Sequence, residues 1–237
     1  MREDILKDKN VLITGATGGL GRAIALELAP KVNSLFLAGR NEIKMFELEE
    51  ELFAMGKESR SFIADFCHDT AILSLIEQII DKDVDILINS AGMFPLKNIA
   101  DSTLKDYNDC LNVNVKAPFL LSKVLSESMK EKRWGRIVNI GSSSSYNGSE
   151  DTGIYCTSKH ALLGLTRSLY KELKDHDVRV YSVSPGSIQT EMGKTDIRQN
   201  FDTFLKPEEV AEYISFILSF DKELVSEEIR LNRFVIE

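Results

Sequence analysis

Tyr155 and Lys159 are the side chains in this sequence whose types and spacing best suit proton transfer. They lie four residues apart near the start of an expected helix, so both project from one helical face. A tyrosine normally titrates near pH 10, which is too high for efficient proton exchange at neutral pH. A lysine ammonium alongside favours the phenolate, so we expect Lys159 to lower the pKa of Tyr155. A tyrosine activated in this way can serve as a general acid or base.

A second tyrosine–lysine pair with the same spacing, Tyr170 and Lys174, lies late in the same expected helix. Spacing cannot choose between the two pairs, but their surroundings can. Ser142 follows an expected strand thirteen residues before Tyr155, where its hydroxyl can hold a carbonyl oxygen against the phenol. Tyr170 has no comparable strand-end serine, and the acidic residues around it favour a solvated helix face. The sequence therefore assigns the proton-transfer chemistry to Ser142, Tyr155 and Lys159.

A glycine-rich turn follows the first expected strand and opens a helix that runs to about residue 29. Residues 14–21 read TGATGGLG, with the spacing G-x-x-x-G-x-G rather than the G-x-G-x-x-G of the general dinucleotide fingerprint. Glycines permit positive φ and let the backbone approach a pyrophosphate, while the helix N-terminus supplies N–H groups and a favourable dipole. The alternative is a tight strand-to-helix turn with no ligand. The position after the first strand favours a dinucleotide site.

Short apolar runs alternate with amphipathic helical stretches along the chain. Most of the runs are nearly continuous hydrophobic segments, as in strands that are covered on both faces. Repeated β-α-β units joined by right-handed crossovers build a parallel sheet with helices on both sides. The sequence thus predicts an α/β fold with a doubly wound parallel sheet of about seven strands, the Rossmann fold. The expected strands are Val11–Thr14, Ser34–Ala38, Ser61–Ala64, Val84–Asn89, Arg136–Ile140, Arg179–Val183 and Ile229–Val235.

Length and composition narrow the class of protein. The 237 residues fit a single domain spanning 1–237, with no room for a separate substrate domain. The net charge of −8 argues against nucleic-acid binding. No apolar run is long enough to cross a bilayer, and the charged segment 1–10 is unlike a secretory signal, so we expect no membrane span. The cysteines and histidines are widely spaced, which predicts a reducing cytoplasm, no disulfide and no metal site: Cys67, Cys110, Cys156, His68, His160 and His176.

Seven motifs follow one another along the chain. They are TGATGGLG at 14–21, Asp65 after the third strand, NSAG at 89–92, Asn114 within LNVNVKAPF, Ser142 within IVNIGS, YCTSK at 155–159 and PGSIQT at 185–190. In this order and spacing they resemble the short-chain dehydrogenases/reductases, in their compact single-domain form, over nearly the whole chain. The resemblance implies an oxidoreductase that moves a hydride between a nicotinamide dinucleotide and a carbonyl or alcohol.

The resemblance also implies a role for each catalytic residue. Tyr155 would be the general acid in reduction and the base in oxidation. Lys159 would lower the pKa of Tyr155 and hydrogen-bond the nicotinamide ribose. Ser142 would position the substrate oxygen, and Asn114 would hold a water that relays protons from Lys159 to solvent.

The cofactor contacts implied by the family lie on the same motifs. Asp65 would meet the adenine amino group, and Asn89 would support the ribose region. Ile188 and Thr190 would fix the carboxamide, which sets the face of the ring offered to substrate. The full set comprises Gly15, Thr17, Gly18, Gly19, Leu20, Gly21, Arg40, Asp65, Phe66, Asn89, Ala91, Gly92, Tyr155, Lys159, Pro185, Gly186, Ile188 and Thr190.

The end of the second strand favours NADP(H) over NAD(H). NAD-specific sites of this type carry an acid there to bind the adenosine ribose hydroxyls, and this chain has no acid before Glu42. Arg40 could instead clamp a 2′-phosphate through its planar fork. The alternative is a solvated arginine at a strand end.

The substrate and the assembly are less closely specified. The substrate is a small-molecule carbonyl or alcohol, a 3-oxoacyl thioester among the candidates, and residues 93–96 are candidates to line its pocket. Segment 231–237 lacks the glycine-rich sequence that family members often use to build tetramers, so we expect a homodimer, with a homotetramer as the alternative. Helices around 103–130 and 152–175 carry apolar residues on more than one face: Leu111, Phe119, Leu120, Leu121, Leu162, Leu163, Leu165 and Leu169.

Two other classes of protein share such a fold. A non-catalytic dinucleotide-sensing regulator generally loses the tyrosine or the lysine, whereas this chain has both. A nucleotide-sugar epimerase or dehydratase uses the same pair but normally needs a larger C-terminal substrate domain. An assay of NADPH oxidation across a panel of aldehydes and ketones separates the three classes.

Replacing Tyr155 by phenylalanine keeps the ring and deletes only the hydroxyl. Loss of a general acid typically costs about a hundredfold or more in turnover, so kcat of Tyr155→Phe should fall by at least about that factor while cofactor affinity changes little. Tyr170→Phe is the matched control and should leave turnover almost unchanged. A damaging Tyr170→Phe beside an active Tyr155→Phe would show that the wrong pair was chosen.

Overall fold

Seven parallel strands form one sheet in the computed structural model, which describes residues 5–234. The strand order is β3-β2-β1-β4-β5-β6-β7, and every pairing is parallel. The doubly wound parallel sheet expected from the sequence is therefore confirmed. The strands are β1 Asn10–Thr14, β2 Ser34–Gly39, β3 Ser59–Ile63, β4 Ile86–Asn89, β5 Gly135–Ile140, β6 Val178–Pro185 and β7 Glu228–Leu231.

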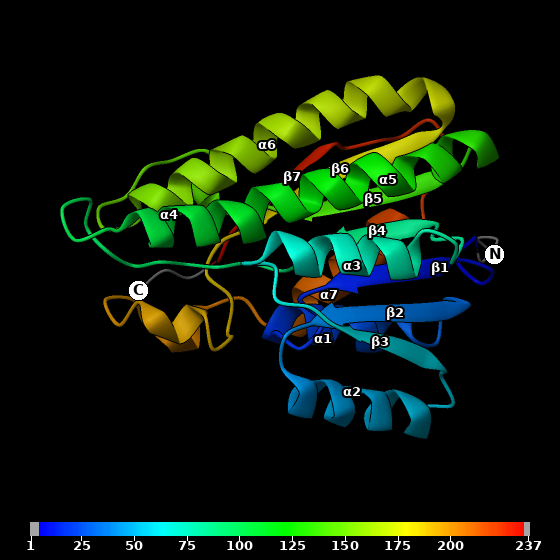
Figure 1. The fold of residues 1–237 in the computed structure, drawn as a ribbon, viewed down its shortest axis with the longest axis horizontal. Helices are drawn as coiled ribbons and strands as arrows, with labels where there is room; N and C mark the ends of the chain where they lie inside the picture. The colour runs from blue at the N-terminus through cyan, green and yellow to red at the C-terminus, as the bar shows by residue number, and fades with distance from the viewer. Residues whose placement is uncertain (1–4, 235–237) are drawn as a thin grey trace.

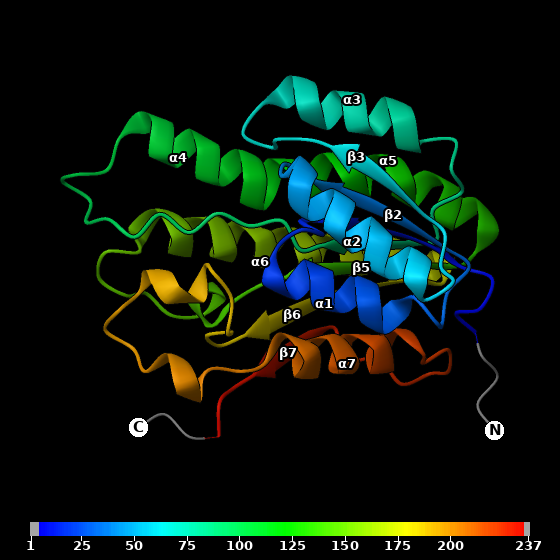
Figure 2. The same ribbon diagram turned by 90° about the horizontal axis from the view of Figure 1, so that it is seen from below.

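Helices cover the sheet on both faces (Figures 1 and 2). On one face, α1, α2 and α7 enclose a core with residues of β1, β2, β6 and β7. On the other, α3 to α6 cover the sheet, and α3 and α5 share a second core with residues of β5 and β6. Among the described residues, no helix combines the length and apolar character needed to cross a membrane. The helices are α1 Gly19–Leu28, α2 Glu42–Ala54, α3 Asp69–Ile79, α4 Leu104–Leu111, α5 Ala117–Lys132, α6 Gly153–Leu173 and α7 Pro207–Leu218.

The sheet explains why the central strands are so apolar. Both faces of β4 and β5 are covered, and all their residues are buried. Strand order reverses at β1, which pairs with β2 on one side and β4 on the other. In such sheets the crevice at the carboxyl ends of the strands on either side of the reversal is the usual ligand site. The loops that follow the strands gather at the end of the molecule where the strands have their carboxyl ends (Figure 1).

The prediction for the last strand was wrong in its second half. The expected run was Ile229–Val235, but β7 ends at Leu231, and Val235 lies outside the described residues. Arg233 turns toward the segment before α7, where it donates to the Thr203 hydroxyl at 3.0 Å and to Gln199 Oε1 at 3.1 Å. These side-chain bonds take the chain away from its partner strand β6, which ends at residue 185.

Candidate active site

The glycine-rich turn between β1 and α1 packs against the loop that follows β4. Gly15 adopts a φ of +66°, and a Cβ there would lie 2.6 Å from the Ala91 Cα. A Cβ on Gly21 would lie 2.2 Å from the Gly15 carbonyl oxygen. Gly18 is the N-cap of α1, and no side chain caps the helix. The N–H groups of the first turn therefore face outward uncapped, as an anion-binding helix N-terminus requires.

Asn89, at the end of β4, offers a buried oxygen to a ligand. Its Nδ2 donates to Asn139 Oδ1 at 2.8 Å, and Asn139 donates onward to the Thr166 hydroxyl at 2.9 Å. Asn89 Oδ1 has no hydrogen-bond partner within residues 5–234. Leaving such a buried acceptor unpaired costs free energy, which a hydroxyl donor such as a ribose would recover. The residues at this position thus fit a dinucleotide.

Arg40, Thr17 and Asp65 come together at the carboxyl ends of β2 and β3. A Cβ on Gly39 would lie 3.0 Å from the Thr17 hydroxyl, so the glycine turn packs directly beside Arg40. Asp65 accepts a hydrogen bond from the Cys67 backbone N–H at 3.1 Å. That bond, with a smaller contribution from the Arg40 charge, lowers the pKa of Asp65. This end of the site therefore presents one fixed carboxylate and one guanidinium.

The segment after β6 closes the opposite side of the site. Pro185 ends β6 and Gly186 follows it, and Ile188 forms an isolated parallel bridge with the chain at residue 205. A Cβ on Gly19 would lie 2.6 Å from Thr190 Cγ2, so this segment touches the glycine turn. The structure brings the expected cofactor residues to one end of the sheet. Two of them, Leu20 and Phe66, keep their side chains in the core and have only main-chain atoms to offer.

Ser142, Tyr155 and Lys159 meet where β5 ends and α6 begins. Lys159 is 4% exposed, and its Nζ donates to the carbonyl oxygen of Ile140, the last residue of β5, at 2.7 Å. The same Nζ lies 5.6 Å from the centre of the Tyr155 ring. Ser142 accepts a hydrogen bond from the Ser144 backbone N–H at 3.1 Å and lies beside the Tyr155 hydroxyl. The three side chains expected to act together are therefore neighbours.

Burial controls the pKa values of Tyr155 and Lys159. It raises the pKa of Tyr155 to about 12, partly opposed by the Ser142 hydroxyl. It lowers the pKa of Lys159 from 10.5 to about 8. The net direction is upward, so the lowering of the Tyr155 pKa that we expected from Lys159 is not seen for the protein's own groups, in which desolvation of the phenolate is the largest effect. At neutral pH the phenol is protonated and is a proton donor.

A π-helical turn, Asn112–Lys116, interrupts the path from α4 to α5 and carries Asn114. Asn114 Oδ1 accepts from the Met93 backbone N–H at 2.8 Å, and Nδ2 donates to the Met93 carbonyl at 2.9 Å. Nδ2 also donates to the Ser158 hydroxyl at 2.9 Å, and Ser158 donates to the Tyr155 carbonyl at 2.7 Å. Such π turns frequently occur at functional sites. Asn114 therefore fastens the loop after β4 to the helix of Tyr155.

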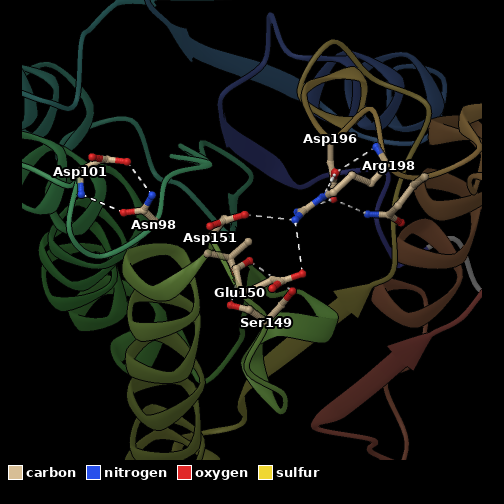
Figure 3. Close-up of polar contacts among 9 residues, drawn as sticks. Asn98, Asp101, Ser149, Glu150, Asp151, Asp196 and Arg198 are labelled. Atoms are coloured by element: carbon tan, nitrogen blue, oxygen red, sulfur yellow. Dashed lines mark hydrogen bonds and ion pairs between the residues drawn. The ribbon is translucent and has the colours of Figure 1, made fainter.

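Charged side chains of the segments after β5 and β6 meet one another, and Asn98 and Asp101 of the loop after β4 lie apart from them (Figure 3). Arg198 pairs with both carboxylate oxygens of Asp196, at 2.7 Å from Nε and 3.2 Å from Nη2. Its Nη1 lies 3.2 Å from Asp151 Oδ2, and the Asp151 carbonyl accepts from the Lys97 backbone N–H at 2.7 Å. A cavity of about 480 Å³ lies between these loops, lined by Leu96, Lys97, Asn98, Asp101, Asp151, Asp196, Ile197 and Arg198.

Phe94, Ser158 and Arg198 have contacts in the site that the sequence does not predict. The Phe94 ring meets the edge of Tyr155, with centroids 4.7 Å apart and planes at 80°, so it covers the phenol. Ser158 lies on the helix of Tyr155, but its partner Asn114 is 44 residues away. Arg198 binds Asp151 across 47 residues. No local pattern reveals such distant partners.

The second tyrosine–lysine pair lies at the far end of α6. Tyr170 is in the last turn of the helix, and Lys174 follows its end. Lys174 is exposed, as expected for a solvated face, whereas Tyr170 is half-buried and packs against the second core. Neither residue is near Ser142, since α6 separates Tyr170 from Tyr155 by four turns.

Fold and site together fit an oxidoreductase of the Rossmann type, and comparison with known proteins specifies the family. The family model for short chain dehydrogenases matches residues 9–200. The chain therefore belongs to the short-chain dehydrogenase/reductase family.

Relatives and solved structures agree with this placement. The 3-oxoacyl-[acyl-carrier-protein] reductase of Aquifex aeolicus is 33% identical over 226 residues, which cover 90% of this chain and 91% of the relative. A metagenomic short-chain oxidoreductase in complex with NADP superposes with a TM-score of 0.85 at 27% identity, covering 97% of this chain and 99% of the other. An NAD⁺-bound xylitol dehydrogenase superposes with a TM-score of 0.86 at 25% identity, covering 96% and 98%.

Replacing Lys159 by methionine should change how stability depends on pH. The pKa of Lys159 is about 8 in the folded protein against 10.5 ordinarily, so between these values the unfolded chain binds the extra proton. The free energy of unfolding of the wild type should therefore rise with pH across this window relative to Lys159→Met. From pH 8 to 9.5 the relative gain should be about 1.5 kcal/mol, because the folded lysine is half protonated at pH 8 and the slope approaches 1.36 kcal/mol per pH unit only above that value.

Urea denaturation at pH 7, 8 and 9.5 measures this difference. Lys174→Met is the control, because Lys174 is exposed and its removal should shift the free energy of unfolding equally at each pH. A constant difference between wild type and Lys159→Met would contradict the lowered pKa of Lys159.

Proposed function

We propose that this protein is a single-domain reductase that transfers hydride from NADPH to a small-molecule carbonyl and, in reverse, oxidises the alcohol. The observation that carries the proposal is the grouping of Ser142, Tyr155 and Lys159 at the carboxyl end of β5, next to an uncapped helix N-terminus and the unpaired oxygen of Asn89. The three side chains can exchange a proton with a carbonyl oxygen. The helix N-terminus suits the pyrophosphate of a dinucleotide, and the Asn89 oxygen suits a ribose hydroxyl.

The residues divide the work of reduction among them. Bound NADPH supplies the hydride from its nicotinamide ring. Ser142 holds the substrate oxygen beside Tyr155, whose protonated phenol donates the proton to that oxygen. Lys159 donates one hydrogen bond to the Ile140 carbonyl, and its ammonium has further N–H donors for a ribose hydroxyl. Because burial raises the pKa of Tyr155 to about 12, the protein's own groups favour proton donation, and hence reduction.

Resupply of the proton runs past Asn114 in this scheme. Both Nδ2 hydrogens of Asn114 have acceptors inside the protein, so a relay water is held by an oxygen of this residue rather than by its amide nitrogen. Asn114 also ties Met93, and with it the loop that carries Phe94, to the helix of Tyr155. Its removal is expected to disturb both the relay and the cover over the phenol.

The polar cavity beside the site favours a substrate whose non-reacting part is polar. Five of its eight lining residues carry charge. The activity of the Aquifex relative makes a 3-oxoacyl thioester the other candidate substrate. The alternative of a non-catalytic dinucleotide sensor is disfavoured, because the chain retains a complete proton-transfer group in contact geometry. NADPH oxidation measured with polar aldehydes, simple ketones and a 3-oxoacyl thioester separates these proposals.

We infer a homodimer from the helices that cover the second face of the sheet. Most of the apolar residues expected there are buried or half-buried within the chain, whereas Phe119 of α5 is 46% exposed. On α4, Leu104 and Tyr107 are also exposed. A second copy related by a two-fold axis would cover such side chains. Light scattering at micromolar concentration should give about twice the 26.6 kDa of one chain, and a monomeric mass would refute the dimer.

Arg40 selects NADPH over NADH in this proposal. The guanidinium is exposed at the end of β2, and no hydrogen bond or salt bridge within the described residues engages it, although the Asp65 carboxylate acts on it electrostatically. A charge-assisted bidentate contact is worth about 1.5–3 kcal/mol, or roughly tenfold to a hundredfold in affinity. Asn41 Oδ1 caps α2 by accepting a hydrogen bond from the Lys44 N–H. The Thr17 hydroxyl, which lies beside Gly39, is therefore the better candidate to bind the 2′-phosphate together with Arg40.

Arg40→Ala should weaken NADPH binding by that factor and leave NADH nearly unchanged. Arg60→Ala is the matched control, since Arg60 is an exposed arginine on the neighbouring strand β3. Fluorescence titration of both nucleotides with each variant gives the four affinities needed. Equal affinity of the wild type for NADPH and NADH, or an equal loss of both affinities in Arg40→Ala, would show that Arg40 does not select the nucleotide.

A further inference from the structure

Arg230 presents a fixed and unpaired guanidinium on the edge strand β7. Strand alternation places Glu228 and Arg230 on the face toward α6, while Ile229 faces the opposite core. The Arg230 guanidinium stacks on the Tyr146 ring, 3.4 Å from its centroid. Within residues 5–234, no hydrogen bond or salt bridge takes any of its N–H groups. Its orientation is therefore set while its donors remain available.

The nearby carboxylate does not neutralise Arg230, because another arginine holds it. Arg167 binds both oxygens of Glu228, at 2.5 Å from Nε and 3.0 Å from Nη2. The Tyr146 hydroxyl also donates to Glu228 Oε2 at 3.1 Å. One carboxylate thus faces two guanidinium groups, and the cluster carries a net charge of +1 on a chain whose total is −8. A positive site on an otherwise acidic protein attracts anions.

A cavity of about 130 Å³ opens beside Arg230 and is lined by hydroxyl and amide groups. Ser143 and Ser184 contribute hydroxyls, and Ser184 is only 2% exposed with a single long contact, 3.3 Å to the Ser182 hydroxyl. About 10–15 Å³ of such space is enough for one water, so this cavity has room for a polyatomic ion. The lining residues are Ser143, Tyr146, Asn147, Ser184, Arg230 and Asn232.

We propose that this cavity binds a small oxyanion, a carboxylate or phosphate group, between the Arg230 guanidinium and the hydroxyls of Ser143 and Ser184. A planar guanidinium fork matches the geometry of two anion oxygens, and hydroxyl donors on the opposite wall complete the set. The cavity lies beside the strand end that carries Ser142, since Ser143 lines it and a Cβ on Gly141 would lie 2.3 Å from the Ser184 hydroxyl oxygen. The oxyanion is either a free ion or an acidic group on the substrate.

Titration with sodium phosphate, followed by the ¹H–¹⁵N signal of Arg230 Nε, tests binding at this position directly. The signal is assigned by its disappearance in Arg230→Gln. We expect a saturable shift with phosphate and with acetate, and none with chloride at equal ionic strength. Ser143→Ala retains Arg230 and should weaken the phosphate affinity by roughly fivefold or more, because one hydrogen bond to a charged group is lost. Arg60 Nε, from an arginine that contacts the Phe62 ring without a comparable cavity, should not shift.

A chloride shift equal to the phosphate shift, or no shift at all, would overturn the site. If Ser143→Ala and Ser184→Ala both bind phosphate as tightly as the wild type does, the two hydroxyls are not part of the site. The phosphate titration needs no enzymatic activity, so its result does not depend on the proposed reductase function.

The two sources of the anion are distinguished by kinetics with benzaldehyde and 4-carboxybenzaldehyde. If the anion belongs to the substrate, Arg230→Gln should lower kcat/KM for the carboxylated aldehyde by about tenfold and leave benzaldehyde unchanged. If the site takes a free ion, both values of kcat/KM of Arg230→Gln should match the wild type. Reduction of neither aldehyde by the wild type would count against the proposed function with these substrates, and the titration would still decide the site.

Discussion

The hydrogen bond from the buried Lys159 ammonium to the Ile140 carbonyl is the interaction on which the geometry of the site depends. It joins the first turns of α6 to the last residue of β5 at 2.7 Å. Tyr155, one turn earlier on α6, is thereby held beside Ser142, two residues beyond the same strand end. A strand-end carbonyl also satisfies part of the ammonium's hydrogen-bonding capacity, which makes burial of the charge tolerable. One contact therefore serves both the fold and the chemistry.

Removal of water from this region acts in opposite directions on the two titrating groups. Each group is driven toward its uncharged form, so the pKa of Tyr155 rises while that of Lys159 falls. The phenol is consequently a ready donor and a reluctant acceptor. Oxidation of an alcohol needs an added positive charge near the phenolate, which an oxidised nicotinamide ring carries. In the proposed reaction, the direction of proton transfer would thus follow the redox state of the nucleotide that binds.

Much of the architecture could be predicted because local sequence patterns specify it. Covered strands such as β4 and β5 are continuous apolar runs, and the motif residues stand directly after strands, where the sheet gathers them. The end of β7 could not be predicted, because Arg233 leaves the sheet for partners 30 and 34 residues away. The Arg198 ion pairs depend in the same way on loops distant in sequence. The direction of the Tyr155 pKa shift could not be predicted either, because it depends on how deeply the phenol is buried, and the spacing of residues in the sequence does not show that.

The position of β1 between β2 and β4 has a consequence for biosynthesis. Its pairing with β2 can form once residue 39 has been made, but its other neighbour, β4, ends at residue 89. At 5–20 residues per second, the ribosome needs roughly 3–10 s to add the fifty residues between these points. During that interval the apolar edge of β1 has no strand to pair with, and such edges are prone to aggregate. A strand that is almost wholly buried in the finished molecule is thus exposed in the nascent chain, at the stage when a chaperone would have most to cover.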